Sequence, residues 1–338
     1  MSAAGQLPAP PRLTLGPLLY HWPAPRRRDF YFRIADEAPV DTVCLGEVIC
    51  AKRAPFHDAK RAPFHDDDLA AVIARLEAAG KEVVMSTLAL VTTPRELAAI
   101  AELAAGGMLV EANDVTAIQA LAGRAFAVGP MVNLFNEGTL DFLLRAGAAR
   151  VALPVELALP AIGLLAAQAP AGATEVQVFG RQTLAISMRC YHARAYGLHK
   201  DACQFVCARD PDGLAADQLD GRGLLAVDGT ATLSHGYLVA LEEIAELRRL
   251  GVGRLRLAPQ WGVGAGMGAG EGAGEGALDM VRVAALFRAV ADAAMAPGEA
   301  AGELRVLTGA VPWINGYLHG RPGMAWVGGG GAEGSPIR

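Results

Sequence analysis

Five cysteines are the residues of this chain whose type and spacing most clearly suggest chemistry. They are Cys44, Cys50, Cys190, Cys203 and Cys207. Twelve residues separate Cys190 from Cys203 and three separate Cys203 from Cys207, so the last two would share one face if they lay on a helix. Thiolates are soft ligands that favour zinc or an iron–sulfur cluster. The spacing therefore indicates a metal site.

The alternative is that these cysteines are only small buried apolar side chains. We favour that interpretation for Cys44, which lies within an expected strand, six residues before Cys50. An extended chain of that length spans roughly 20 Å, too far for both thiols to bind one small cluster. Cys203 and Cys207 instead lie in the polar stretch LHKDACQFVCARDPDG, which favours a metal.

The identity of the metal stays open on spacing alone. Structural zinc usually has two close pairs of cysteines, and this chain has one close pair, Cys203 and Cys207. A radical-SAM cluster needs the pattern CxxxCxxC, but the third residue after Cys207 is Asp210. Zinc therefore remains the main chemical rival of an iron–sulfur cluster, and the radical-SAM pattern is disfavoured.

Short apolar runs that alternate with helical segments must position these cysteines. Several runs lack polar alternation, which is typical of parallel strands covered on both sides. Thr93 before Pro94 predicts a capped helix start. The expected strands are 13–18, 42–46, 82–87, 108–111, 125–128, 150–153, 175–179 and 254–258. They predict an α/β fold, a TIM-barrel-like (β/α)8 barrel. An open doubly wound sheet is the alternative, but we find no glycine-rich dinucleotide loop.

The segment 180–236 interrupts the alternation after the seventh strand and holds three of the cysteines. Within it, 224–227 and 230–233 flank Asp228-Gly229 and predict a hairpin with a type I′ turn. In a barrel, the loops after the second and seventh strands open on the same carboxyl-terminal face. We therefore expect this cysteine-bearing insert to reach across to Cys50.

The expected domain organisation is one barrel domain over 13–327. Residues 1–12 are expected to form a disordered extension, 262–276 a flexible glycine-rich loop and 328–338 a flexible tail. The octapeptide AKRAPFHD occurs at 51–58 and again at 59–66. We interpret it as a duplication tolerated in a loop. A metal site formed by its histidines, His57 and His65, is the less favoured interpretation.

Composition narrows the functional classes. The 338 residues are 52% apolar and 19% charged, which predicts a folded protein with a sizeable core. The formal net charge of -5 gives no electrostatic footprint for nucleic acid. No stretch predicts a membrane span and the start does not resemble a signal peptide. We therefore expect a cytoplasmic protein with reduced cysteines.

Eight short motifs carry a resemblance to a known family. They are LGPLLYHWP at 15–23, CLGEVICAKR at 44–53, MSTLALV at 85–91, LPVEL at 153–157, ISMRCYHAR at 186–194, KDACQFVC at 200–207, RLAPQ at 256–260 and INGYLHG at 314–320. In these motifs and their order the chain resembles the peptidase U32 family, in the branch that serves oxygen-independent ubiquinone biosynthesis. The cysteine-bearing motifs are specific and the others are supportive.

The resemblance implies a 4Fe-4S cluster held by Cys50, Cys190, Cys203 and Cys207, with Cys44 outside the set. It also implies a heterodimer with a paralogue of the same family, which together hydroxylate a ubiquinone-precursor ring without molecular oxygen. The second copy of the octapeptide and the glycine-rich loop depart from the family pattern. Neither removes a ligand, although the first puts the geometry beside Cys50 in doubt.

Other functions remain as alternatives. A U32-type peptidase would need a nucleophile with its base or a metal-bound water, and the chain contains neither HExxH nor GxSxG. Ser234 and His235 are adjacent but prove nothing. A non-catalytic zinc-binding partner protein is a third hypothesis. Hydroxylation of RNA, as in other relatives, is disfavoured by the acidic balance.

Four polar residues are lesser candidates, and no catalytic residue is assigned. Glu47 follows the second strand, where catalytic groups cluster in barrels, or it serves only to pair with Lys52 or Arg53. Glu156 favours the start of a helix on dipole grounds alone. Asn133 and Asn136 line a pocket or simply bond loop backbone.

Overall fold

The computed structural model describes residues 8–54, 66–261 and 278–328. His57, His65, most of the second octapeptide, the glycine-rich segment 262–276 and the terminal stretches 1–7 and 329–338 lie outside the described residues. The expectations stated for those segments, and the domain boundaries that depend on them, stay predictions.

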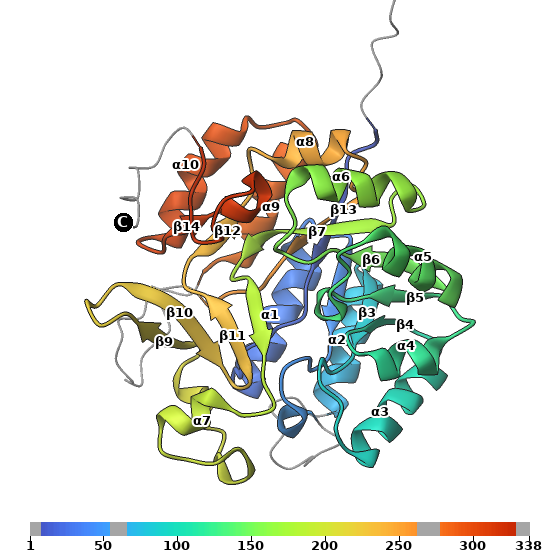
Figure 1. Cartoon of the computed structure of the whole chain (residues 1–338), viewed down its shortest axis with the longest axis vertical. Coiled ribbons are helices and arrows are strands. Elements are labelled where there is room, and N and C mark those ends of the chain that lie inside the picture. Colours follow the sequence, from blue (N-terminus) through green and yellow to red (C-terminus); the bar gives the residue numbers. More distant parts are fainter. Residues whose placement is uncertain (1–7, 55–65, 262–277, 329–338) are drawn as a thin grey trace, which may run out of the picture.

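Eight parallel strands close into a barrel with helices between them, as the sequence predicted (Figure 1). Strand β13 closes the circle by pairing with both β1 and β7. Leu15 of β1, for example, lies opposite Val43 on one side and Leu257 on the other. The barrel strands are β1 (Arg12–Leu15), β2 (Thr42–Leu45), β3 (Glu82–Ser86), β4 (Leu109–Ala112), β5 (Phe126–Val128), β6 (Ala148–Ala152), β7 (Thr174–Gly180) and β13 (Arg254–Leu257). Closure excludes the open doubly wound alternative.

Helices follow the strands and cover the outside of the barrel (Figure 1). In α3 the Thr93 side chain accepts a hydrogen bond from the Glu96 amide and Glu96 returns one to the Thr93 amide, so the predicted cap is confirmed as a full capping box. The helices are α1 (Ala24–Glu37), α2 (Asp66–Ala78), α3 (Pro94–Ala105), α4 (Val115–Leu121), α5 (Glu137–Ala146), α6 (Leu159–Gln168), α7 (Tyr191–Ala195), α8 (Ile244–Arg249), α9 (Met280–Ala291) and α10 (Pro297–Thr308).

Helix α1 contains the basic run Arg26-Arg27-Arg28, and no helix was expected over these residues. In the structure Arg27 is buried together with Tyr31, Ile34 and Ala35 on one side of the helix. The Arg27 guanidinium donates to the Gly46 carbonyl oxygen at 3.4 Å. An arginine can pack its aliphatic stem in the core, which hid the apolar stripe of this helix from a pattern-based analysis.

The segment after β7 forms a separate antiparallel sheet of four strands beside the barrel (Figure 1). Its strands, in spatial order, are β8 (Thr183–Ile186), β11 (Ala231–Ser234), β10 (Gly223–Asp228) and β9 (Leu214–Asp217). After it, β12 (Tyr237–Val239) pairs with β7 and with β14 (Trp313–Ile314). We call residues 181–236 the insert.

The hairpin turn of the insert differs from the prediction. Asp228 pairs with Ala231 in the ladder, so the two turn residues are Gly229 and Thr230 rather than Asp228 and Gly229. Only the first of the two, Gly229, has a positive φ, of 58°, which is the pattern of a type II′ turn and not of type I′. The shift has a physical reason: the Asp228 carboxylate is held by a buried ion pair inside the ladder.

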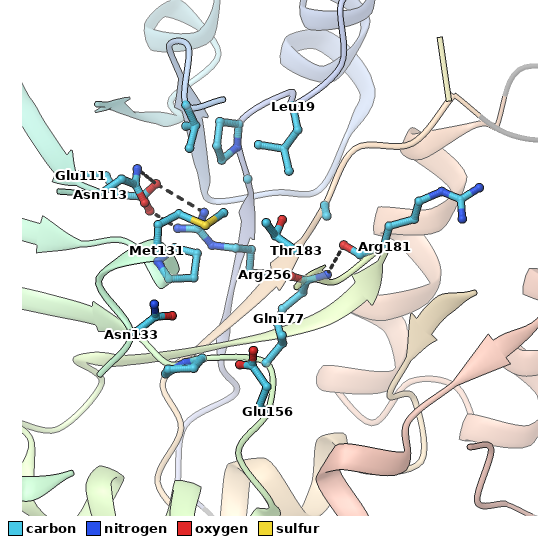
Figure 2. A pocket seen from close by; sticks show the side chains of 17 residues that line it. Leu19, Glu111, Asn113, Met131, Asn133, Glu156, Gln177, Arg181, Thr183 and Arg256 are labelled. Carbon is cyan, nitrogen blue, oxygen red and sulfur yellow. Dashed lines mark hydrogen bonds and ion pairs between the residues drawn. The ribbon is translucent and has the colours of Figure 1, made fainter. Parts of the chain in front are cut away.

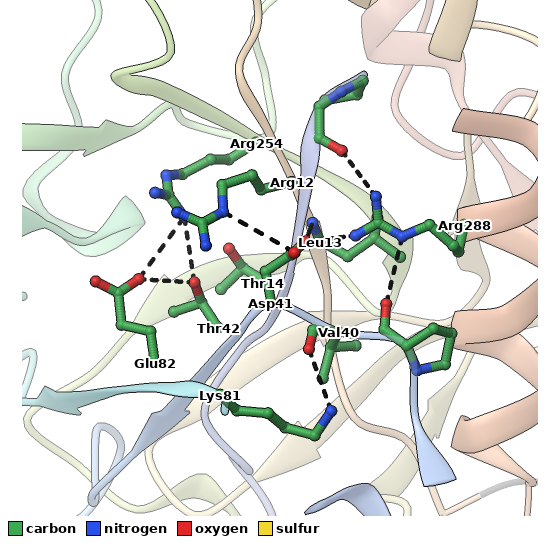
Figure 3. A network of polar contacts seen from close by, with 12 residues as sticks. Arg12, Leu13, Thr14, Val40, Asp41, Thr42, Lys81, Glu82, Arg254 and Arg288 are labelled. Atoms are coloured by element: carbon green, nitrogen blue, oxygen red, sulfur yellow. Dashed lines mark hydrogen bonds and ion pairs between the residues drawn. The ribbon is translucent and has the colours of Figure 1, made fainter. Parts of the chain in front are cut away.

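A polar network closes the amino-terminal end of the barrel (Figure 3). The Arg288 side chain of α9 bonds the Asp41 carboxylate and the carbonyl oxygens of Pro11 and Pro39. Asp41 in turn accepts a hydrogen bond from the Leu13 amide at 2.7 Å. One arginine thus ties the helix that follows β13 to the segments that begin the first two strands.

Candidate functional site: a cysteine pocket beside the barrel mouth

The four cysteines assigned as ligands come from two distant parts of the chain. Cys50 lies in the loop after β2, directly before the 3-10 turn Ala51–Arg53. Cys190 precedes α7, Cys203 ends the 3-10 turn Lys200–Ala202, and Cys207 lies in the next 3-10 turn, Val206–Arg209. The last three therefore belong to the insert, and the first belongs to the barrel.

Cys203 and Cys207 do not share the face of one helix, as their spacing allowed. Between them, Gln204 and Phe205 both have positive φ values, of 52° and 53°. Two successive residues in the left-handed conformation interrupt the helical path between the two cysteines. This conformation is costly for residues other than glycine. The segment instead folds back so that the thiols of both cysteines border the same space.

One pocket is lined by all four of these cysteines, together with Lys52, Arg53, Lys200, Phe205, Val206 and Gly229. Cys44 does not line it; its thiol is buried in the barrel, 4.0 Å from a guanidinium nitrogen of Arg256. Within the described ranges, no three His, Cys, Asp or Glu side chains are arranged as a group that could hold a metal ion. The four thiols therefore share a pocket without forming a ready-made site for a single ion.

A buried ion pair joins the two parts of the chain that supply the cysteines. The Arg53 guanidinium donates to both carboxylate oxygens of Asp228, at 2.7 and 3.0 Å, and to the Leu19 carbonyl oxygen at 2.8 Å. Both charged side chains are almost completely buried, at 1% and 0% exposed. Thr230 also donates to the Ile49 carbonyl oxygen at 2.7 Å. The hairpin turn is thus fixed against the loop that carries Cys50.

Burial controls the protonation of the thiols. Desolvation raises the pKa of Cys50 and of Cys190, and raises that of Cys207 to about 11, while the nearby Arg53 charge opposes these shifts. Buried thiols of this kind stay protonated at neutral pH. The positive charge of a bound metal reverses that preference, because a coordinated thiol loses its proton. Cys50, Cys190 and Cys207 therefore give no reactive free thiolate by themselves and fit the binding of a cationic group.

The part of the insert that carries the cysteines has a small hydrophobic core of its own. Cys190, Ala193 and Val206 pack together there, and the Ala193 amide donates to the Cys190 sulfur at 3.3 Å. The Asp210 carboxylate bonds His192 Nε2 at 2.7 Å and accepts from the Tyr196 hydroxyl at 2.8 Å. Hydrogen bonds and a few apolar contacts, rather than a deep core, hold the ligand loops in place.

A second pocket lies at the carboxyl-terminal mouth of the barrel, the end at which TIM-barrel enzymes bind their substrates (Figure 2). This barrel-mouth pocket is a hollow of about 590 Å³, counting its open side. Its lining includes Leu19 after β1, Val48 after β2, Asn133 after β5 and Glu156 after β6. Asn133 and Glu156 are only lesser candidates on the sequence, where nothing shows that they meet.

An ionic layer forms the floor of this pocket. The Arg256 guanidinium lies between the carboxylates of Glu111 and Glu175 and bonds both. Ser86 donates to Glu111 at 2.9 Å and Thr14 donates to Glu175 at 2.7 Å. Barrel interiors are usually filled by branched apolar side chains, so a buried charged layer directly under the mouth marks this end as specialised.

The remaining candidates have structural roles. One Glu47 oxygen accepts hydrogen bonds from the amides of Ile49 and Cys50, at 3.0 Å each; burial raises the pKa of this carboxyl group. Asn136 caps α5 by accepting from the Thr139 amide at 2.9 Å. The Ser234 hydroxyl donates to the Gly236 carbonyl oxygen at 2.7 Å rather than to His235.

These features define a (β/α)8-barrel protein with a cysteine-bearing insert packed beside the barrel mouth. The family model described as peptidase family U32 matches residues 31–325. The chain therefore belongs to peptidase family U32. No helix within the described ranges has both the length and the apolar character needed to cross a membrane.

Two solved structures are distantly similar to this chain. One is the crystal structure of a spore coat polysaccharide biosynthesis protein, SpsE, from Bacillus subtilis, with 12% identity and a TM-score of 0.43, covering 92% of this chain and 74% of that one. Another is a mutant N-acetyl-D-glucosamine-6-phosphate deacetylase from Mycobacterium smegmatis, with 14% identity and a TM-score of 0.29, covering 88% of this chain and 68% of that one.

Proposed function

We propose that this chain is an iron–sulfur protein of the UbiV type. In this proposal it is a subunit of the oxygen-independent hydroxylase that modifies a ubiquinone-precursor ring, and it acts with a UbiU-like paralogue. The observation that carries the proposal is that Cys50, Cys190, Cys203 and Cys207, separated by up to 157 positions in sequence, line one pocket. Membership of family U32 and the in-order motifs support the particular branch.

The residues present fit a 4Fe-4S cluster. Four cysteine thiols are the usual ligand set, and such a cluster supplies one-electron transfer when bound. Arg53 lies beside the pocket and offsets the negative charge of thiolates, while Glu47 holds the amide of Cys50 in place. Phe205 and Val206 cover the pocket with apolar surface, which limits the access of water.

Metal analysis tests the cofactor. Protein purified without oxygen should contain iron and acid-labile sulfide in equal amounts, approaching about four of each per chain. Changing Cys50, Cys190, Cys203 or Cys207 to Ala should remove most of both, whereas the matched variant Cys44→Ala should keep them. Stoichiometric zinc without sulfide would overturn the cluster in favour of a zinc-binding partner protein.

Size-exclusion chromatography tests the partner. Co-expression with a UbiU-like paralogue under anoxic conditions should yield a heterodimer that contains both chains. A chain that elutes as a monomer in the presence of the paralogue would contradict the proposed complex, whatever its metal content.

Quinone profiling tests the pathway. A deletion strain should lack ubiquinone when it is grown without oxygen and make it normally with oxygen, and the wild-type gene should restore the anoxic synthesis while Cys203→Ala should not. Normal anoxic ubiquinone in the deletion strain would contradict the function but leave the metal site intact. In that case the rival activity of the family, peptide hydrolysis, becomes the next assay.

A further inference from the structure

The barrel-mouth pocket has no role in the metal site, yet it has the composition of a ligand site. Apolar side chains form most of its walls: Pro17, Leu19, Val48, Met131, Pro154 and Val155. The polar side chains of the lining are Glu111 and Arg256 in the ionic floor, with Asn113, Asn133, Glu156, Gln177, Arg181 and Thr183 around it (Figure 2). Sites for small molecules typically combine an apolar lining with a few well-placed polar groups.

The charges around the pocket disfavour an anion. Arg256 is fully engaged by Glu111 and Glu175, so two carboxylates face one guanidinium in the floor. Arg181 contributes to the lining, but its guanidinium points away from the pocket (Figure 2) and bonds Asp212 at 2.9 Å. Glu156 adds a further carboxylate at the side. Without Arg181, the charged side chains of the lining are two carboxylates, Glu111 and Glu156, and one guanidinium, Arg256, which raises the cost of bringing in a carboxylate or phosphate.

The walls favour a flat, apolar body. The Met131 sulfur can contact an aromatic ring favourably, and Leu19 and Val48 present aliphatic surface from the neighbouring loops. A hydroxyl group on such a ring can donate to the carboxylate of Glu156 or to the side-chain oxygen of Asn133. A neutral ring with a hydroxyl donor therefore matches both the walls and the charge of the pocket.

The barrel-mouth pocket is also next to the cysteine pocket. Val48 lines the first and Cys50 lines the second, with one residue between them. Leu19 lines the first with its side chain, while its carbonyl oxygen accepts from Arg53, which lines the second. The Cα atoms of Val48 and Cys50 can be no farther apart than two successive Cα–Cα steps of about 3.8 Å each. The walls of the two pockets are therefore built from neighbouring residues of the same loops.

The geometry points to the barrel mouth as a binding site for a small, neutral, hydroxylated aromatic ring. This deepens the proposed function, since it assigns ring binding to this chain rather than to its partner. The assignment of the ring as the substrate of a cluster-containing hydroxylase rests on the proposed function. The selectivity for a neutral ring rests on the pocket itself.

Ligand-observed NMR on the whole chain tests this with two para-substituted toluenes, the neutral para-cresol and the anion para-toluate. We expect para-cresol to bind at least about tenfold more tightly, a difference of about 1.4 kcal/mol. Met131→Trp should weaken para-cresol binding about tenfold by filling the pocket. The control variant Val115→Trp, at a position that is 70% exposed, should leave para-cresol binding unchanged.

Two further variants keep the test decisive. If Met131→Trp does not fold, Met131→Ala should weaken para-cresol binding by removing wall contacts. Glu156→Gln should narrow the preference for the neutral probe by making para-toluate bind more tightly. Tighter binding of para-toluate to the unmodified chain, or para-cresol binding that ignores the substitutions at Met131, would overturn the inference.

Metal analysis of the same preparation separates the two claims. Binding of para-cresol to protein that holds no iron or sulfide would uphold the ring site and contradict the proposed cluster. Iron and sulfide without binding of para-cresol would contradict the ring site and uphold the cluster.

Discussion

Two buried arginines hold two different regions of this molecule, and the comparison shows how unequally those regions are supported. Arg256 lies inside the barrel, between Glu111 and Glu175, on strands that are paired on both sides. Arg53 lies at the junction of barrel and insert and pairs with a single carboxylate, Asp228. The barrel is held by a closed ladder as well as by its ion pairs, whereas the insert depends on a few buried polar contacts. The cysteine pocket is thus the region easier to disrupt.

The largest expected effect comes from Arg256→Met. It leaves two buried carboxylates without their cation, which should lower the free energy of unfolding of the whole chain by about 5 kcal/mol. Urea denaturation followed by circular dichroism measures this. The control is Arg75→Met, which breaks a solvent-exposed pair with Asp36 and should lower the free energy of unfolding far less, because water screens such a pair. Equal losses in the two variants would mean that the ionic layer does not support the barrel.

Asp228→Ala should have the next largest effect, about 3 kcal/mol, because it leaves the buried Arg53 charge unpaired. We expect this loss to appear as local opening of the insert, with protease cleavage within 181–236 and a retained barrel signal in circular dichroism. The double variant Arg53→Met with Asp228→Leu removes both charges and should recover much of the stability. Cleavage spread evenly over barrel and insert would contradict the separation of the two regions.

Acid should act on the junction through His21. Burial and the nearby charges of Arg53 and Arg27 lower its pKa to about 3. Below about pH 6.5 the imidazole binds a proton in the unfolded chain but stays unprotonated in the folded chain. The free energy of unfolding therefore falls as the pH drops from there toward 3. Between pH 7 and pH 5 the loss should be about 2 kcal/mol.

A matched pair of variants isolates this effect. The His21 ring stacks on Phe205, with 5.4 Å between the ring centroids. His21→Phe keeps an aromatic ring there and should remove that part of the pH dependence in urea denaturation. His199→Phe, at an exposed position, should leave it in place. An unchanged pH slope in His21→Phe would show that another group causes the acid sensitivity.

The smallest effect is expected for Thr93→Ala, which removes the capping box of α3 on the outside of the barrel. It should cost about 1 kcal/mol and leave both iron content and para-cresol binding unchanged. A loss of either would mean that the outer helices control the two pockets, and the regions would then be less independent than their contacts indicate.

The barrel could be predicted from the sequence because each strand is a short apolar run with a local signal, from 13–18 to 254–258. The cysteine set could be named because its motifs are specific. The pairing of Arg53 with Asp228 joins residues 175 positions apart, and no local pattern reports such a contact. The turn at Gly229-Thr230 was misplaced for the same reason, since the ion pair keeps Asp228 inside the ladder. Asn133 and Glu156 carry no signal of their own, because only the closed barrel brings them together.

The closure of the barrel by β13 also has a consequence for synthesis of the chain. Strand β13 fills the space between β1 and β7, but it is made after Cys50, Cys190, Cys203 and Cys207 have all left the ribosome. At about 5–20 residues per second, the nascent chain carries every cysteine of the pocket for several seconds while β1 has an unpaired edge, which is a hazard for aggregation. Production of intact protein should therefore depend on chaperones that shield this edge until β13 arrives.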